Sequence, residues 1–218
     1  MLGFEDASRR LFAALYDPLV WPAERFLFRP HRQYLAGDLS GRVLDLGCGT
    51  GATFPHLAGV PDLTVYAVEP DPYMRGRAAR RAASVGLDVD IAAARAEQLP
   101  FAAESLDAVL AGMVLCTVED PAAALAEVAR VLRPGGELRF FEHVRGEGVR
   151  GRLQDRATPL WRRVAGGCHA NRATGERIEA HPRFRVTDLT RLDVGVFPVR
   201  PFVRGTAVRV DGEATATV

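Results

Sequence analysis

The sequence predicts a single α/β domain organised around a mostly parallel β-sheet. Its 218 residues suit one sizeable domain, and a 48% share of hydrophobic residues is enough to build a core. Between residues 42 and 142, short apolar runs alternate with helical patterns. This alternation is typical of βαβ units, whose parallel strands are buried on both faces by helices.

Residues 1–40 are expected to form two helices that precede the sheet. Apolar side chains recur there at three- and four-residue spacing, which is the period of an amphipathic helix. Pro18 and Pro22 interrupt this stripe and are expected to separate the first helix from a second over residues 23–36. The stripe comprises Leu11, Phe12, Leu15 and Leu19.

The central part of the chain is expected to supply the parallel strands and the helices that cover them. Gly86 and the Pro134-Gly135-Gly136 run are signals at which helices commonly end. The expected strands cover residues 42–46, 63–68, 89–92, 106–111 and 137–142, and the expected helices begin at 52 and cover 72–85 and 122–132.

The pattern changes after residue 143. A longer helix is expected over residues 149–164, followed by a Gly-Gly-Cys loop and a short helix over 176–180. Residues 184–192 and 202–210 alternate between apolar and polar side chains, which is typical of an antiparallel hairpin.

Charge balance and cysteine usage exclude several classes of protein. The net charge is +1, so no field of the whole protein indicates DNA or a membrane as partner. The three cysteines form no C-x-x-C pair, which favours a reduced cytoplasmic setting over a zinc knuckle or a disulfide framework. The longest apolar run, residues 108–116, is far shorter than the ~20 residues of a membrane-spanning helix. With no apolar signal region at the N-terminus, we expect a cytoplasmic monomer or homodimer without stable membrane insertion.

The strongest functional signal is the glycine-rich run V-L-D-L-G-C-G-T-G at residues 43–51. Apolar residues typical of a strand lead into three glycines at alternate positions, and a helix is expected directly afterwards. Glycine lets the backbone turn sharply and approach a ligand closely. The G-x-G-x-G spacing differs from the dinucleotide fingerprint, and Asp45 would repel a pyrophosphate but attract an α-amino group. The run therefore favours a nucleoside that carries an amino acid.

This run resembles motif I of the class I S-adenosylmethionine-dependent methyltransferases, and the resemblance extends over roughly residues 42–144. It implies a Rossmann-like fold with a seven-stranded, mostly parallel sheet, an antiparallel C-terminal hairpin and an N-terminal helical lid. Within one domain, residues 1–40 would form the lid, 41–144 the cofactor-binding core, and 145–210 the substrate side. S-adenosylmethionine is the implied cofactor, and S-adenosylhomocysteine is its product.

The resemblance also implies roles for residues outside motif I. Glu69 stands 24 residues after Asp45, where the family's acidic residue binds both ribose hydroxyls. Residues 96–101 are similar to the family's A-E-x-L-P-F segment beside adenine, although Arg95 replaces the aspartate often found before it. The residues expected to bind or flank the cofactor are Tyr16, Asp45, Gly47, Cys48, Gly49, Gly51, Glu69, Pro70, Ala96, Glu97, Met113 and Val114.

A narrower resemblance concerns the methyl acceptor. The segments L-C-T-V at 115–118, E-H-V at 142–144 and G-C at 167–168, with Arg172 and Thr174, are similar to the group that includes membrane-associated thiol methyltransferases. This similarity makes the sulfur of a small thiol the leading acceptor. Oxygen or nitrogen of a small metabolite, or a phospholipid amine, is the alternative.

Candidate catalytic and substrate-binding residues follow from the ligand edge of the sheet. His143 ends the fifth expected strand, and His169 lies in the Gly-Gly loop; either could take a proton from the acceptor. For His143, a structural role is an equally good interpretation, and for Cys168 packing is the better one. No metal is expected. The candidate substrate-binding residues are Trp21, Cys116, Cys168, Asn171 and Arg172.

Two other functions stay open at this point. Between residues 145 and 209, 14 Arg face six acidic residues, and such a basic surface could receive RNA, a phospholipid headgroup or another anion. A solvated helix face explains the same excess, and no N-P-P-Y-type motif supports RNA methylation. A non-catalytic protein that binds the cofactor is the second alternative, which the intact motif I and Glu69 argue against.

Overall fold

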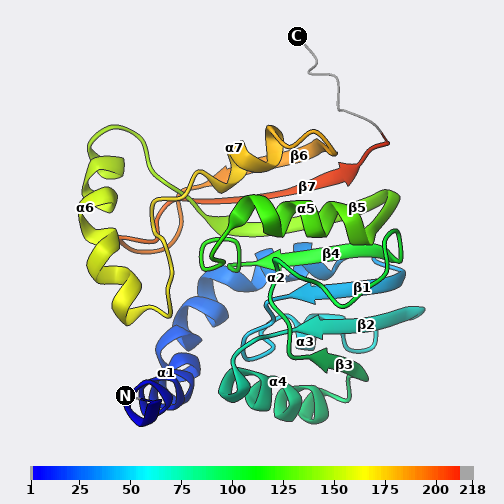
Figure 1. Ribbon diagram of the computed structural model, residues 1–218, viewed down its shortest axis with the longest axis horizontal. Helices are drawn as coiled ribbons and strands as arrows, with labels where there is room; N and C mark the ends of the chain where they lie inside the picture. The colour runs from blue at the N-terminus through cyan, green and yellow to red at the C-terminus, as the bar shows by residue number, and fades with distance from the viewer. Residues whose placement is uncertain (1, 212–218) are drawn as a thin grey trace.

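The computed structural model describes residues 2–211, with side chains from residue 6 onward, and contains a seven-stranded sheet flanked by helices (Figure 1). The strand order is β3-β2-β1-β4-β5-β7-β6, which confirms the expected architecture. The strands are β1 (Gly41–Leu46), β2 (Leu63–Val68), β3 (Val89–Ala92), β4 (Leu106–Gly112), β5 (Leu132–His143), β6 (Phe184–Leu192) and β7 (Phe202–Arg209). The helices are α1 (Leu2–Ala23), the π-helical η1 (Glu24–Phe28), α2 (Arg29–Ala36), α3 (Phe54–Leu57), α4 (Pro72–Val85), α5 (Pro121–Val131), α6 (Gly148–Val164) and α7 (Thr174–Glu179).

The first five strands are parallel, and β1 lies between β2 and β4. The strand order reverses at β1, so the carboxyl ends of β1 and β4 border the crevice where open α/β sheets bind their ligands. Asp45 lies in β1, one residue before its carboxyl end, and Glu69 directly follows β2. The fold therefore brings both acidic residues to one edge of the sheet.

Helices bury both faces of the sheet, as the apolar runs predicted. On one face, α2, α3 and α4 pack against side chains such as Val43, Val65 and Ala67. On the other, α5 and α7 pack against side chains such as Leu44 and Val109. Successive side chains of the central strands point alternately into these two cores. Both faces of these strands are therefore buried, which explains their continuous apolar runs in the sequence.

The C-terminal hairpin completes the sheet in the antiparallel sense. Strand β7 is inserted between β5 and β6 and pairs antiparallel with both. Its first residue, Phe202, pairs with His143 at the end of β5. The connection between these strands carries α6 and the loop that contains Cys168, so this part of the chain returns to the ligand edge.

The N-terminal helices differ from the expectation. Pro18 and Pro22 do not end the first helix, which runs unbroken to Ala23 and continues as the wider η1 turn. A proline removes one hydrogen bond and commonly bends a helix, and the π-helical segment begins at Glu24, two residues after the second proline. Three leucines of the apolar stripe are exposed: Leu19 is 75% exposed, and Leu11 and Leu15 are also exposed. No helix within residues 2–211 combines the length and apolar character needed to cross a bilayer.

One strand begins earlier than expected. The helix stop at Pro134-Gly135-Gly136 lies inside β5, which starts at Leu132 rather than at residue 137. The register between β4 and β5 shifts there, because Leu106 pairs with Leu132 whereas Ala108 pairs with Glu137. The glycines thus form an irregularity within the strand, and Gly135 has a φ of +78°.

Candidate active site

The motif I loop requires its glycines for two different reasons. Gly47, Gly49 and Gly51 all adopt positive φ angles, of 58°, 56° and 80°. A Cβ at Gly47 would collide with Val114, and one at Gly51 would collide with Phe54. A Cβ at Gly49 would meet no protein atom within 4 Å. The loop therefore packs tightly at its ends and leaves open space beside Gly49, where a ligand can approach the backbone.

Glu69 is held at this open space by backbone donors. Its Oε2 accepts a hydrogen bond from the N–H of Gly49 at 3.0 Å, and its Oε1 accepts one from the N–H of Asp71 at 2.8 Å. Burial raises the pKa of the carboxyl group, while these two bonds favour its charged form. Each oxygen keeps a further lone pair, so the carboxylate is able to accept two hydroxyl groups from one ligand.

Asp45 is the unsatisfied member of the site. Its side chain is 2% exposed, and its Oδ2 has no hydrogen-bond partner among the described residues. Burial raises the pKa of Asp45 to about 7, against the opposing effect of Arg32. A buried, unpaired carboxylate oxygen is costly unless a ligand completes it. An ammonium group meets that need, so this position fits the α-amino group of S-adenosylmethionine.

Arg32 is a central residue that the sequence reasoning missed. It is 4% exposed and forms an ion pair with Glu24, with Nη2 and Oε1 2.9 Å apart. Its Nη1 lies 3.4 Å from Thr53 Oγ1 and 3.4 Å from the carbonyl oxygen of Gly112. Arg32 therefore links the N-terminal helices to the residues after motif I and to β4. The available signal was its helical spacing with the buried Phe28 and Leu35, which placed an arginine on the core-facing side.

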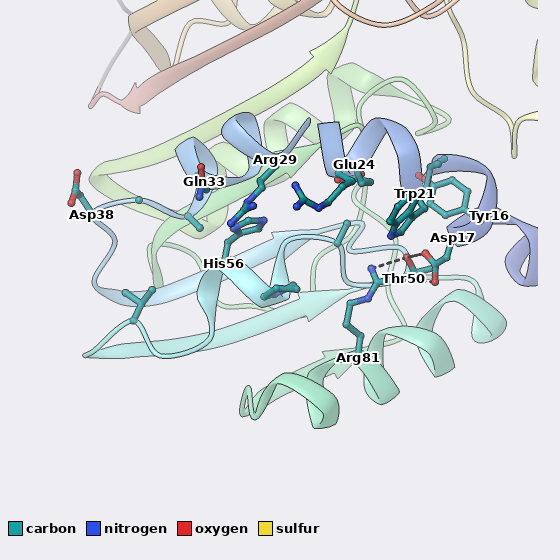
Figure 2. A pocket seen from close by; sticks show the side chains of 17 residues that line it. Tyr16, Asp17, Trp21, Glu24, Arg29, Gln33, Asp38, Thr50, His56 and Arg81 are labelled. Atoms are coloured by element: carbon teal, nitrogen blue, oxygen red, sulfur yellow. Dashed lines mark hydrogen bonds and ion pairs between the residues drawn. The ribbon is translucent and has the colours of Figure 1, made fainter. Parts of the chain in front are cut away.

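The N-terminal helix α1 is attached directly to motif I. Asp17 accepts a 2.6 Å hydrogen bond from the Thr50 hydroxyl and forms an ion pair with Arg81 of α4 at 3.1 Å (Figure 2). The same residues border a cavity of about 790 Å³. Burial raises the pKa of the neighbouring Tyr16 to about 12. The cavity flanks motif I, but Asp45 and Glu69 do not line it.

A buried carboxylate organises the loop after β4. Glu142 is fully buried, and burial raises its pKa to about 7. Its oxygens accept backbone N–H groups of three successive residues, Val114, Leu115 and Cys116, at 2.8, 2.9 and 3.3 Å. From the other side, Arg172 donates to the carbonyl oxygens of Leu115 and Val118 at 2.6 and 2.7 Å. Arg172, a predicted substrate contact, thus holds the loop itself.

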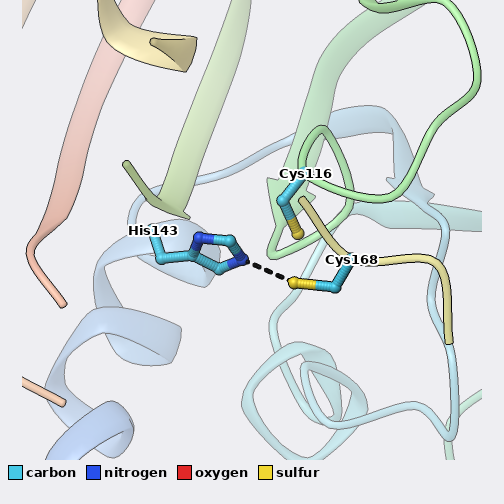
Figure 3. A group of neighbouring side chains, drawn as sticks. All are labelled: Cys116, His143 and Cys168. Carbon is cyan, nitrogen blue, oxygen red and sulfur yellow. Dashed lines mark hydrogen bonds between the residues drawn. The ribbon is translucent and has the colours of Figure 1, made fainter. Parts of the chain in front are cut away.

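Three side chains from distant parts of the chain converge beside this loop (Figure 3). His143 Nε2 lies 3.0 Å from the sulfur of Cys168, and the ligand atoms of Cys116, His143 and Cys168 lie within 4.8 Å of one another. The indole N–H of Trp161 also donates to the Cys168 sulfur, at 3.2 Å. The Cys116 thiol, followed by His143 and Trp161, lowers the pKa of Cys168. His143 and Cys168 are thus paired with each other, and His143 Nδ1 has no partner among the described residues.

The remaining predicted residues fall into two groups. Met113, Val114 and Ala96 lie near the ligand edge, and His169 is joined to it through its backbone N–H, which donates to the Cys116 carbonyl oxygen. Trp21 is 59% exposed and lies against Phe26, and Asn171 binds Asp155 at the surface. These last two side chains do not converge with the cysteines and His143.

Three further predicted cofactor residues have structural contacts of their own. Glu97 accepts the backbone N–H groups of Glu119 and Asp120 at 2.7 and 3.2 Å. Cys48 is packed in a hydrophobic cluster with Phe54 and Ala67. Pro70, next to Glu69, is exposed, and its carbonyl oxygen accepts a hydrogen bond from Arg75.

Many of the C-terminal arginines are paired with acidic residues. Pairs between exposed side chains contribute little stability. The pairs are Arg145–Asp155, Arg150–Asp193, Arg200–Asp193, Arg191–Glu147 and Arg209–Glu104. Asp155, Asp193 and Glu147 already belong to the six acidic residues counted between 145 and 209, so apart from the Arg209–Glu104 pair these contacts leave the local excess of arginine unchanged.

Comparison with known proteins agrees with this geometry. A model of a methyltransferase domain matches residues 44–140, from β1 into β5. Thiol S-methyltransferase TMT1B of Homo sapiens is 32% identical over 179 residues, which cover 78% of this chain and 72% of that protein. The chain belongs to the S-adenosylmethionine-dependent methyltransferases. The TMT1B protein of Rattus norvegicus is 37% identical over 142 residues, but the match spans 63% of this methyltransferase and only 57% of the rat protein.

Solved structures show the same fold. A geranyl diphosphate methyltransferase in complex with S-adenosylmethionine superposes with a TM-score of 0.69 at 18% identity, covering 83% of this methyltransferase and 85% of that chain. A methyltransferase of Thermotoga maritima also gives a TM-score of 0.69, at 24% identity, with 94% and 99% of the two chains covered. S-adenosylmethionine is therefore the cofactor, and the unpaired Asp45 oxygen and the open space at Gly49 fit it.

Proposed function

We propose that this methyltransferase transfers the methyl group of S-adenosylmethionine to the sulfur of a small-molecule thiol. The extent of its likeness to thiol S-methyltransferases carries the proposal. The matches to the human TMT1B and TMT1A proteins cover 78% and 91% of the chain, well beyond the matched methyltransferase domain. The likeness therefore includes segments outside the cofactor-binding core, where the acceptor is expected to bind.

The residues of motif I and β2 have distinct roles in this proposal. When bound, S-adenosylmethionine supplies an electrophilic methyl group on a sulfonium. Asp45 accepts the α-amino group, and Glu69, already oriented by the Gly49 and Asp71 N–H groups, accepts the ribose hydroxyls. Ala96 and Glu97 flank the adenine, Met113 and Val114 back the methionine portion, and α1 with Tyr16 covers the site.

A thiol acceptor requires the protein to hold it in position but requires little further catalytic assistance. At neutral pH a few per cent of a thiol is already thiolate, and sulfur is strongly nucleophilic. Holding that thiolate in line with the methyl group then supplies most of the acceleration. The pairing of His143 with the Cys168 sulfur, at 3.0 Å, agrees with a reaction that needs no free histidine base.

Initial rates with matched panels of small thiols, phenols and amines test the proposed acceptor. With a thiol, the rate should rise with pH as the thiolate fraction grows, until the pH exceeds the ordinary thiol pKa of about 8.5. The Glu69→Ala variant serves as the control, because methyl transfer that does not depend on the cofactor site would persist unchanged in it. Preference for phenols or amines, with no thiol turnover, would rule out S-methylation while leaving the methyltransferase assignment intact.

N-methylation of a phospholipid amine is the second candidate. Phosphatidylethanolamine N-methyltransferase of Cereibacter sphaeroides is 29% identical over 158 residues, which cover 71% of this chain and 75% of that protein. Vesicles that contain phosphatidylethanolamine therefore belong in the amine panel. A thiol acceptor stays ahead of this candidate because the thiol S-methyltransferases match more of the chain.

A further inference from the structure

We propose that Cys116, His143 and Cys168 form a binding site for one thiophilic metal ion, with Zn²⁺ as the best fit. The three residues come from the loop after β4, the end of β5 and the loop after α6 (Figure 3). Their side chains are buried, with residue exposures of 2%, 2% and 7%. The site goes beyond the proposed methyl transfer, and nothing in motif I or at Glu69 depends on it.

The donor atoms have the identity and the spacing that zinc requires. Zinc binds thiolate sulfur at ~2.3 Å and imidazole nitrogen at ~2.0–2.1 Å, which places neighbouring ligand atoms of a tetrahedron about 3.5 Å apart. Here the three ligand atoms lie within 4.8 Å of one another, and His143 Nε2 and Cys168 Sγ are 3.0 Å apart. Side-chain movements of no more than about 1.5 Å would bring all three atoms to the spacing around a zinc ion.

The ligand set leaves one coordination position free. Among the side chains described, those of residues 6–211, no fourth His, Cys, Asp or Glu belongs to this group. The nearby carboxylate of Glu142 is engaged by three backbone N–H groups. Two cysteines and one histidine with an open fourth position is a ligand set found in zinc enzymes, where water or an exogenous ligand completes the tetrahedron.

Hydrogen bonds from neighbouring residues hold two of the proposed ligands, Cys116 and Cys168, in place. Glu142 and Arg172 fix the backbone that carries Cys116 from both sides, through N–H and carbonyl groups. The His169 N–H adds a third restraint on the Cys116 carbonyl oxygen. The Trp161 indole N–H donates to the Cys168 sulfur at 3.2 Å, the kind of outer hydrogen bond that orients a metal-bound thiolate. A cysteine used only for packing needs none of these restraints.

Metal uptake by the full-length, reduced protein tests the site directly. After chelator treatment and chelator removal, wild type is titrated with Co²⁺ and then Zn²⁺. We expect one Co²⁺ per chain, with the intense thiolate-to-cobalt absorption and visible bands of a tetrahedral site, and displacement by one Zn²⁺. Cys116→Ser and Cys168→Ser should each weaken the thiolate-to-cobalt absorption and lower the affinity. His143→Gln should lower the affinity while both thiolates remain.

Matched controls separate the site from general thiol binding. Cys48→Ser also leaves two cysteines, and His169→Ala removes a histidine next to Cys168; both should bind cobalt as wild type does. Trp161→Phe keeps all three ligands but loses the outer hydrogen bond, and should lower metal affinity roughly 10–100-fold. Circular dichroism of each apo variant checks that the chain is folded, and the wild-type titration does not depend on any variant.

The proposal is overturned if folded, reduced wild type takes up no stoichiometric cobalt or zinc. It is also overturned if Cys48→Ser loses the signal as fully as Cys116→Ser does. A Cys116–Cys168 disulfide, detected by mass spectrometry of the unreduced protein, contradicts the proposal when reduction fails to restore metal uptake. None of these readouts uses methyl transfer, so the metal site and the thiol acceptor can fail independently.

Discussion

The cofactor side and the acceptor side of this methyltransferase are built in different ways. On the cofactor side, nine consecutive residues, 43–51, contain the strand end, the acidic residue and the glycines, and Glu69 follows the next strand. On the proposed acceptor side, Cys116, His143 and Cys168 come from three separate segments. A site made by a backbone turn is therefore recorded locally in sequence, whereas a site made by converging side chains depends on the whole fold.

Arg32 joins the N-terminal helices to the cofactor side, and removing it should have the largest effect. Arg32→Ala leaves Glu24 without its ion-pair partner and removes the positive charge that opposes the raised pKa of Asp45. We expect a loss of about 3 kcal/mol in the free energy of unfolding, as for other broken buried pairs, measured by urea denaturation. Arg29→Ala, at an exposed position of the same helix, should change it by no more than ~0.5 kcal/mol. Equal losses in the two variants would show that Arg32 is not a buried link.

Glu69→Ala tests how far the cofactor side depends on one carboxylate. Two ribose hydroxyls lose a charged acceptor, so affinity for S-adenosylhomocysteine should fall by about 1–3 kcal/mol, roughly 5- to 150-fold. Isothermal titration calorimetry measures the change. Asp90→Ala on β3 removes an exposed acidic residue of the same half and should leave the affinity unchanged. Unchanged affinity in Glu69→Ala would remove Glu69 from the site.

The pH dependence of cofactor binding tests Asp45. Its pKa of about 7 in the unliganded fold means that the carboxyl group must lose a proton before it can pair with an ammonium group. Affinity for S-adenosylhomocysteine should therefore rise as the pH increases toward 7, and fall again at alkaline pH as the α-amino group itself loses its proton. In Asp45→Asn, the rise below pH 7 should disappear. A rise of the same size in that variant would assign the titration to another group.

The same titration affects stability with a defined sign. Because the folded-state pKa of Asp45 is raised above its ordinary 3.8, the folded protein holds the extra proton between that value and about 7. The contribution of Asp45 to stability without ligand is therefore lost as the pH rises through this range. Urea denaturation at pH 5 and pH 8 should show a smaller decrease in Asp45→Asn than in wild type, which also isolates Asp45 from Glu142.

His169→Ala should have the smallest effect, and it addresses the acceptor side. A thiol acceptor needs no general base, so turnover should fall by less than ~10-fold. A hydroxyl acceptor that relied on His169 would lose ~100-fold or more. Initial rates with a thiol and a phenol, measured with both proteins, distinguish these cases. Collapse of phenol turnover in the variant, together with preference for phenols in wild type, would identify His169 as the base.

The sequence predicted the sheet and the cofactor loop because both leave local patterns. The expected bounds of β2, β3, α4 and β6 agree with the structure, since apolar period and glycine or proline punctuation decide them. The end of the first helix was misjudged because Pro18 and Pro22, which commonly interrupt a helix, lie inside α1. The helical spacing of Arg32 indicates a core-facing side chain but not its partners, and the contacts of Arg32 and of His143 with the two cysteines could not be predicted because they join distant segments.

The insertion of β7 between β5 and β6 sets an order of events during synthesis. Strand β5 pairs along Glu137–His143 with residues that are translated about sixty positions later. Until then, the growing chain carries a long strand with an unpaired edge, which is a surface prone to join other chains. Phe202 closes that edge and at the same time stacks on Phe141 and packs against Phe28 of the N-terminal helices. The contact between Phe28 and Phe202 can therefore form only after β7 has been synthesised, and a chain that stops before β7 leaves this edge of β5 unpaired.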